Sequence, residues 1–220
     1  MTGVQTCALP ISVNNYFSNN VSILKNNGSG TFAGAVNYGV GNDPQCVIAA
    51  DFNGDGHPDV AVANGQTNNV SILINNGSGA FASAINYGVG MNPWSVFAAD
   101  FNGDAHLDLA IANIMSNTVS ILENQGNGTF ASAVDYGVGS YPRSIFAVDF
   151  DGDGHQDLAV ANTSSNSVSI LENNGNGTFS GADDYGTGIE PWSIFAADLD
   201  GDGDNDLATA NVGSDRKSVV

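Results

Sequence analysis

The sequence predicts an all-β fold, a β-propeller of four-stranded blades with about four blade equivalents. Three observations predict it: a motif that recurs every 49 residues, closely spaced turns rich in Gly and Asn, and short apolar segments of strand length. Self-similarity at a fixed period of this size is typical of repeat architectures. No apolar stripe with a 3.6-residue period fits between the turns, so helices are not expected.

The repeat is regular along the chain. An acidic motif, a Val-Ser-Ile-Leu segment and a Tyr-Gly pair each return with the same step of 49 residues. A single unit of this kind cannot bury its apolar side alone, so the units are expected to pack in series. The three segments begin at Asp51, Asp100, Asp149 and Asp198; at Val21, Val70, Val119 and Val168; and at Tyr38, Tyr87, Tyr136 and Tyr185.

Each unit is predicted to hold four short strands, which in the unit 140–188 span 144–149, 157–161, 167–172 and 179–185. The first two are apolar without alternation, which predicts burial on both faces. Four-stranded sheets stacked face to face around an axis bury their inner strands in this way. A parallel β-helix is the alternative, but its rungs are shorter and lack regular hairpin turns. A sandwich would not repeat at a fixed period.

The two ends are expected to lie outside the natural protein. Residues 1–11 and 215–220 read, as codons, like the two adapters of short-read DNA sequencing, and such segments are set aside before the fold is considered. The remaining segment, 12–214, divides into half-blades and complete blades in the order 20–41, 42–90, 91–139, 140–188 and 189–213. The half-blades either pair to close a small ring or end an open arc. Because the adapter-like ends indicate that the segment was cut at accidental positions, the open arc is favoured.

The composition excludes several kinds of partner. The chain of 220 residues carries 23 Asp and Glu against 4 Lys and Arg, for a formal net charge of −19. Nucleic acids and anionic membranes require Lys and Arg, so neither is an expected partner, whereas multivalent cations are. An apolar fraction of 42% suffices for a folded core. No run of 18 apolar residues is present, so no transmembrane segment is predicted.

The acidic motif, Asp-x-Asp/Asn-Gly-Asp-Gly-x-x-Asp, predicts up to four Ca²⁺ loops. Oxygen ligands at positions 1, 3, 5 and 9, with a backbone carbonyl at position 7, suit a hard cation of flexible coordination better than Mg²⁺, which demands a tighter octahedron. The glycines allow the backbone to curl around the ion. The candidate ligands are Asp51, Asn53, Asp55, His57 and Asp59; Asp100, Asn102, Asp104, His106 and Asp108; Asp149, Asp151, Asp153, His155 and Asp157; and Asp198, Asp200, Asp202, Asp204 and Asp206.

Other interpretations of these loops fit less well. Solvated Asp-Gly turns would not keep the same four positions in four copies. An EF-hand requires a bidentate Glu at position 12, and that position holds Val62, Ile111, Val160 and Thr209. The three His residues stand at position 7 of separate repeats, so a zinc triad is not favoured. Their imidazoles are expected to face solvent.

A second group of candidate residues opens each blade. Trp94, Arg143 and Trp192 occupy equivalent positions just after a Pro, and Gln45 holds that position in the first complete blade. Variation at one position of a regular repeat is typical of a binding face, and Trp and Arg are residue types that anchor interfaces and stack on ligands. The alternative is that the two Trp side chains cap the gap between blades.

The motifs resemble those of the FG-GAP repeats of the integrin α-subunit propeller and their bacterial relatives, also called VCBS or FG-GAP-like repeats. The resemblance rests on the four loops and on Phe…Tyr-Gly-x-Gly…Pro-x-Ser elements such as Phe130, 136–139 and 142–144, and it covers residues 20–211. It implies a propeller whose Ca²⁺ loops join the first two strands of each blade. The units are shorter than the integrin repeat, and Ala105 replaces a loop Gly.

These observations predict a calcium-binding propeller module of a secreted or cell-surface protein that mediates adhesion or protein or carbohydrate binding. Exposed loops of this kind bind Ca²⁺ at extracellular concentrations, about 10⁻⁴–10⁻³ M. No nucleophile–base pair and no phosphate-binding loop is present, so the segment is not expected to be an enzyme. The alternatives are the non-catalytic propeller part of an extracellular hydrolase or lyase, and a structural spacer.

Overall fold

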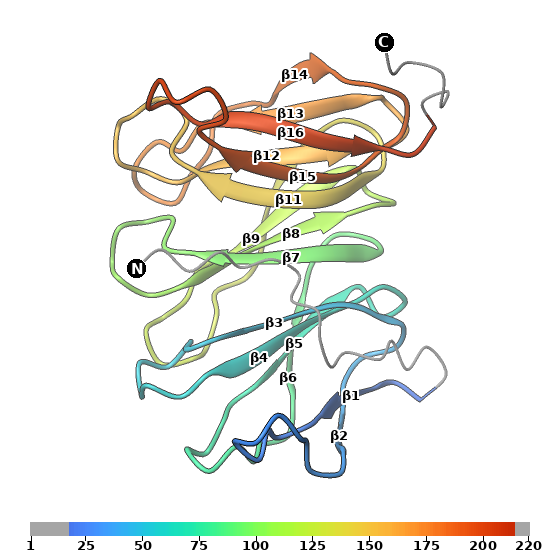
Figure 1. Cartoon of the computed structure of the whole chain (residues 1–220), viewed down its shortest axis with the longest axis vertical. Helices are drawn as coiled ribbons and strands as arrows, with labels where there is room; N and C mark the ends of the chain where they lie inside the picture. Colours follow the sequence, from blue (N-terminus) through green and yellow to red (C-terminus); the bar gives the residue numbers. More distant parts are fainter. Residues whose placement is uncertain (1–17, 214–220) are drawn as a thin grey trace.

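The described residues, 18–213 of the computed structural model, form an all-β arrangement without helices. The two ends expected to be foreign, 1–11 and 215–220, lie outside these residues. Antiparallel sheets are stacked one upon another along the long axis of the molecule (Figure 1). This arrangement confirms the fold class that the repeat predicts.

Three middle sheets have four strands each, paired in chain order from first to fourth. The first is β3 (Pro44–Ala50), β4 (Asp59–Asn64), β5 (Asn69–Leu73) and β6 (Ile85–Gly88). The second is β7 (Pro93–Ala99), β8 (Asp108–Asn113), β9 (Thr118–Leu122) and β10 (Val134–Gly137). The third is β11 (Pro142–Val148), β12 (Asp157–Asn162), β13 (Ser167–Leu171) and β14 (Asp183–Gly186).

The sheets at the two ends have two strands each. β1 (Asn20–Ile23) pairs with β2 (Val36–Gly39), and β15 (Pro191–Ala197) pairs with β16 (Asp206–Asn211). By the 49-residue step, the first pair corresponds to the third and fourth strands of a blade and the second pair to the first and second. Figure 1 shows β1 and β2 at the bottom of the view and β15 and β16 in its upper part, overlapping the third middle sheet, and the two pairs form separate sheets. The sheets therefore form an open arc.

The second strands are the centre of the core. Every residue of β4, β8 and β12 is buried, as the unbroken apolar pattern predicts. Apolar clusters join neighbouring sheets; one of them combines Ile72 of the first middle sheet with Val96 and Leu109 of the second. The core therefore lies between sheets, so each sheet depends on its neighbours for burial.

The first strands differ from the prediction that both their faces are buried. In β3, β7 and β11 buried residues mostly alternate with partly exposed ones. The first strands lie next to one another at one edge of the stack, β3 against β7 and β11 against both β7 and β15. Rings of Phe97, Phe146 and Phe195 contact in sequence on these strands, with centroids 5.5 and 5.2 Å apart. Because the first strands stand at the edge of the stack, one face of each strand is only partly covered by neighbouring residues.

The fourth strands are shorter than predicted. The third middle sheet was expected to extend its fourth strand over 179–185, but β14 begins at Asp183, and Phe179 makes only an isolated bridge to Asn173. The Phe179 ring instead packs edge-on against Tyr136 and Phe101 of the preceding sheet, with centroids 5.5 Å from each. Because the Phe179 ring packs on the neighbouring sheet, the backbone at Phe179 does not continue the pairing of β14 with β13.

The same contact joins the second middle sheet to the first, and the first middle sheet to the sheet of β1 and β2. Phe130 packs edge-on against Tyr87 at 5.4 Å and Phe52 at 5.7 Å, and Phe81 packs against Tyr38 at 5.3 Å. Edge-to-face aromatic pairs of this kind contribute about 0.5–1.5 kcal/mol beyond their buried area. The Phe and Tyr-Gly elements of the repeat therefore build the joint between blades.

Candidate calcium loops and aromatic rim

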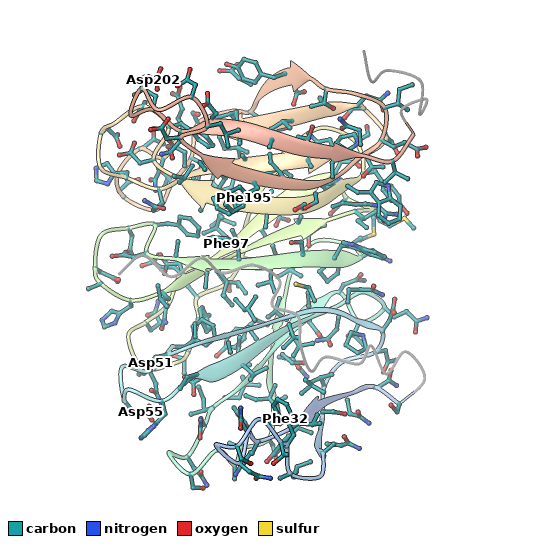
Figure 2. The ribbon with its side chains drawn as sticks, in the orientation of Figure 1. Phe32, Asp51, Asp55, Phe97, Phe195 and Asp202 are labelled. Atoms are coloured by element: carbon teal, nitrogen blue, oxygen red, sulfur yellow. The ribbon has the colours of Figure 1, made fainter. Side chains whose placement is uncertain are left out.

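The acidic loops connect the first and second strands of each sheet, so they all leave the first strands at the same end. Figure 2 shows Asp51 and Asp55 of the first loop and Asp202 of the fourth along one side of the molecule. The loop side chains are largely exposed or half-buried there, except at position 9 of the first three loops and at Phe52 and Phe101, which stand at position 2 and are buried. This placement follows from the repeat, because equivalent residues in stacked sheets recur along one edge.

Position 1 organises the loop backbone. Asp51 accepts hydrogen bonds from Gly54 N and Gly56 N, each at 2.8 Å. Burial alone would raise the pKa of Asp51, but the backbone N–H groups of the loop outweigh it and lower the pKa below its ordinary value. Position 6 has a left-handed backbone in all four loops, with φ of 83° at Gly56, 69° at Ala105, 92° at Gly154 and 100° at Gly203.

Positions 3 and 5 differ between loops. In loop one the amide of Asn53 donates to Asp55 Oδ2 at 3.1 Å, and loop two repeats this bond from Asn102 to Asp104. Loops three and four have carboxylates at position 3, which cannot donate. Carboxylate oxygens there lie within 4.8 Å of one another in two groups: Asp149, Asp151 and Asp153, and Asp198, Asp200 and Asp206. An oxygen-only donor set of this kind fits a hard cation.

Position 9 is buried in the first three loops. Asp59, Asp108 and Asp157 are at most 1% exposed. The Asp108 carboxylate accepts from Phe101 N at 3.1 Å and Asn124 N at 2.8 Å, so it ties the loop to the turn between the third and fourth strands. Burial raises the pKa of Asp108 to about 6, and burial likewise raises the pKa values of Asp59 and Asp157.

Among residues 18–213, the fourth loop is not followed by a turn of the kind that buries position 9 elsewhere. Asp206 is half-buried, and its Oδ2 accepts from Leu199 N at 3.0 Å. Its carboxylate joins the group formed with Asp198 and Asp200, whereas Asp157 stays outside the group of its own loop among the described residues. The structure thus brings together positions 1, 3 and 5 in loop three and positions 1, 3 and 9 in loop four.

The three histidines contact glycines rather than one another. His57, His106 and His155 lie against Gly77, Gly126 and Gly175, where an added Cβ would come within 3.1, 2.7 and 2.7 Å of the imidazoles. His106 and His155 are half-buried by this contact, so the expectation that the imidazoles face solvent holds only for His57. The glycine in each Asn-x-Gly turn was the sequence signal for this packing, because it leaves room for a ring.

Trp94, Arg143 and Trp192 come together at the opposite end of the first strands from the loops. They are the second residues of β7, β11 and β15, which are neighbours. The Arg143 guanidinium carbon lies 3.9 Å from the Trp192 ring centroid and 4.8 Å from that of Trp94. We call these three residues, with Tyr141, the aromatic rim.

Tyr141 was not identified from the sequence. Its ring centroid lies 5.2 Å from the Arg143 guanidinium carbon, and its backbone is left-handed, with φ of 64°. Its equivalents Asp43, Asn92 and Glu190 share that conformation, and all four precede the Pro of a first strand. Gln45, the equivalent of Arg143, donates instead to Asp43 Oδ1.

Stacked four-stranded antiparallel sheets with adjacent first strands and an acidic loop at each first connection define a repeat protein of the propeller type. The sequence matches the FG-GAP-like repeat at residues 11–62, 51–111, 100–160 and 149–209. The chain belongs to the FG-GAP-like repeat family. Among the described residues, no helix is long and apolar enough to cross a membrane.

Solved structures of several kinds share this fold. An Agrocybe aegerita lectin that recognises non-reducing terminal N-acetylglucosamine is 24% identical, with a TM-score of 0.55 over 87% of this chain and 55% of its own. A candidate 6-phosphogluconolactonase from Bacteroides fragilis is 16% identical, with a TM-score of 0.62 over 88% of this chain and 52% of its own. The V. cholerae biofilm matrix protein Bap1 is 22% identical, with a TM-score of 0.54 over 89% of this chain and 29% of its own.

These likenesses show the fold alone, because one fold serves many functions. The chain spans about half the length of the lectin chain and less than a third of Bap1. No curated protein matches the chain.

Proposed function

We propose that this chain is a calcium-binding repeat module of an extracellular or cell-surface protein, which binds a glycan or protein ligand and is not itself an enzyme. The observation that carries the calcium part is the grouping of carboxylate oxygens within 4.8 Å of one another in loops three and four. Carboxylates this close repel one another strongly, and a bound divalent cation would neutralise that repulsion.

The loop residues fit a hard cation in different degrees. Loops three and four offer three grouped carboxylates each, whereas loops one and two have a neutral amide at position 3 that already bonds the position 5 carboxylate. We therefore expect loops three and four to bind Ca²⁺ more tightly. In the first three loops, the buried position 9 carboxylate accepts hydrogen bonds from the backbone of position 2 and from the next turn, so it holds the loop against that turn.

The aromatic rim supports the ligand-binding part of the proposal. It places two indoles, a phenol ring and a guanidinium side by side, and Trp192 is 46% exposed. Large aromatic residues and Arg are the types that most often anchor interfaces. The lectin and the biofilm matrix protein that share the fold have roles compatible with a binding module, although the inference rests on the rim residues.

Calcium dependence of the melting temperature tests the metal sites. With a dissociation constant of about 0.1 mM, about 1 mM Ca²⁺ would stabilise the fold by roughly 1.4 kcal/mol per site. Loops three and four together would then contribute roughly 3 kcal/mol, and replacing Asp151 and Asp200 by Asn should remove most of it. Asp183→Asn, on an exposed strand residue, removes one charge outside the loops and should leave the calcium response intact. An unchanged midpoint on adding Ca²⁺ would reject the metal sites.

A further inference from the structure

Arg143 is a cation without an acceptor. Lys25 and Arg143 are the only Lys and Arg among the described residues, and Lys25 donates to Ser78 O at 2.9 Å. Arg143 Nε is buried and has no hydrogen-bond partner. No carboxylate of the described residues forms an ion pair or hydrogen bond with the guanidinium, although the chain has 23 acidic residues.

The surroundings of Arg143 hold the guanidinium in place but offer its N–H groups no hydrogen-bond acceptor. The rings of Trp94, Trp192 and Tyr141 contribute cation–π attraction, but they offer no acceptor for its N–H groups. A buried donor without a partner costs about 1–3 kcal/mol, and more when it is charged. The two terminal guanidinium nitrogens are not among these buried atoms, so the acceptor oxygens of a ligand can reach them.

We propose that the aromatic rim binds the carboxylate of an acidic sugar, with Arg143 as the anion-binding residue. This inference rests on the proposed ligand-binding function and specifies its ligand class. Guanidinium N–H groups match a carboxylate in a planar, two-point contact. A single cation balances a single negative charge, which favours a carboxylate over a doubly charged phosphate. The exposed ring of Trp192 supplies a flat apolar surface beside it, of the kind that packs against a sugar ring.

The strongly negative charge of the chain does not exclude an anionic ligand at this place. The acidic loops begin after the last residue of each first strand, whereas Trp94 and Arg143 are second residues. Five residues of extended strand lie between the two sites, which separates them by about 20 Å. That distance is more than two Debye lengths at physiological ionic strength, so the loop charges are largely screened at the rim.

Tryptophan fluorescence gives a direct test, because Trp94 and Trp192 are the only two Trp residues of the chain and both contact Arg143. The protein is titrated with a hyaluronan tetrasaccharide, and separately with its carboxyl-reduced form, in which each glucuronic acid has become glucose. We expect the acidic form to bind at least tenfold more tightly. Arg143→Gln, which installs the residue that the first complete blade has at this position, should abolish the preference.

Two further variants make the result specific. Lys25→Gln removes the same unit of charge far from the rim in sequence and should leave the preference unchanged. Arg143→Lys keeps the charge but loses the planar fork, so it should weaken binding of the acidic form several-fold while the fold, followed by thermal melting, stays intact. Arg143→Lys also keeps the test decisive if Arg143→Gln fails to fold.

The possible outcomes separate this inference from the proposed function. Equal binding of both tetrasaccharides, a preference that survives in folded Arg143→Gln, or unchanged binding of the acidic form by Arg143→Lys would overturn the role of Arg143. Binding of the carboxyl-reduced form with loss in Trp192→Ala would keep a glycan-binding module but reject its specificity for acids. Absence of any fluorescence change rejects the inference, while calcium-dependent melting would still support the loops.

Discussion

Ala105 has a left-handed backbone at a position where the other three loops have glycine. Its N–H donates to Asp100 Oδ2 at 2.9 Å, so the strained conformation allows the loop backbone to curl around the position 1 carboxylate. A left-handed conformation costs a non-glycine residue roughly 1–2 kcal/mol. We expect Ala105→Gly to tighten calcium binding at loop two about tenfold, the factor that corresponds to 1.4 kcal/mol, as measured by calorimetric titration.

The reciprocal substitution is the matched control. Loop one has the same ligand types as loop two but keeps Gly56, with φ of 83° and open space around an added Cβ. Gly56→Ala should therefore weaken loop one by a similar factor without any steric clash. If both substitutions leave the titration unchanged, the left-handed conformation is already present in the ion-free loop, and its cost falls on the stability of the fold rather than on calcium binding.

Position 9 predicts a pH dependence in the absence of divalent cations. The pKa of Asp108 is about 6 in the folded chain, above its ordinary value of 3.8, so the folded state binds this proton more tightly than the unfolded state. The resulting stabilisation is fully present below about pH 4 and is lost as pH rises through 6, on the order of 2–3 kcal/mol. Melting in chelator between pH 4.5 and 7.5 should show a falling midpoint.

Asp108→Asn isolates that contribution from the general repulsion of an acidic chain. The amide oxygen can still accept one of the two backbone N–H groups but no longer titrates across this range. We expect a lower midpoint at pH 4.5 and a shallower decline towards neutral pH than in the parent. Parallel curves for the two proteins would show that the carboxyl group ionises in the folded state near its ordinary pKa.

Among single residues, the sequence predicted the conformation of the acidic loops better than the contacts of the aromatic rim. Glycines at fixed positions indicated a left-handed backbone because few other residues adopt it. The burial of position 9 was not predictable, since Asp108 bonds a turn residue, Asn124, that lies 16 positions further on. Equivalent positions indicated that Trp94 and Arg143 belong together, but their stacking depends on how neighbouring sheets are placed.

At the scale of elements, a buried Asn joins the second and third middle sheets each to the one before it. Asn173 donates to Phe101 O of the preceding sheet at 2.9 Å and to Gln156 O of its own sheet at 3.0 Å. Replacing it by Ala leaves buried carbonyls without donors, each costing about 1–3 kcal/mol. We expect Asn173→Ala to lower the free energy of unfolding by about 2–4 kcal/mol, measured by urea denaturation.

Asn75 provides the control for the bond between sheets. It is the equivalent residue of the first middle sheet and donates to Pro58 O at 3.0 Å, without a bond to a preceding sheet among the described residues. Asn75→Ala should therefore be less destabilising than Asn173→Ala. The difference between their losses in free energy of unfolding measures the contribution of the hydrogen bond between sheets. Equal losses for both variants would mean that the bond between sheets contributes nothing.

The strands show which parts of a repeat the sequence can specify. The second strand was correctly expected to be buried throughout, because an unbroken apolar run in the middle of a sheet has few alternatives. The first strand has a similar composition yet is partly exposed, because it stands at an edge that other blades would have to cover. The fourth strand was predicted too long, because Phe179 looks like a strand residue but packs on the neighbouring sheet.

At the scale of the whole molecule, the open ends are complementary. Phe32 is 49% exposed, whereas its equivalents Phe130 and Phe179 are buried in joints. At the other end, a pocket of about 390 Å³ lined by Phe150 and Tyr185, among others, takes the place where such a ring would sit. We expect copies of the chain to associate end to end, β1 and β2 of one completing the sheet of β15 and β16 of another, since exposed apolar faces and unpaired strands promote association.

Sedimentation at increasing concentration measures this association. Phe32→Ser should weaken it about tenfold or more, whereas Met115→Ser, at a side chain that is 61% exposed away from the end sheets, should have little effect. A compact monomer at all concentrations would indicate instead that the two half-sheets of one chain pair and close a small ring.

The joints also determine how the molecule comes apart. Among the described residues, each apolar core cluster joins two sheets that are neighbours in the sequence. Each middle sheet is therefore held from two sides and each end sheet from one. A linear array of this kind loses its terminal units first, and the loss of one unit leaves the remaining joints unchanged. Fraying therefore proceeds inward from both ends, and amide protons of β1 and β16 should exchange with solvent well before those of β8.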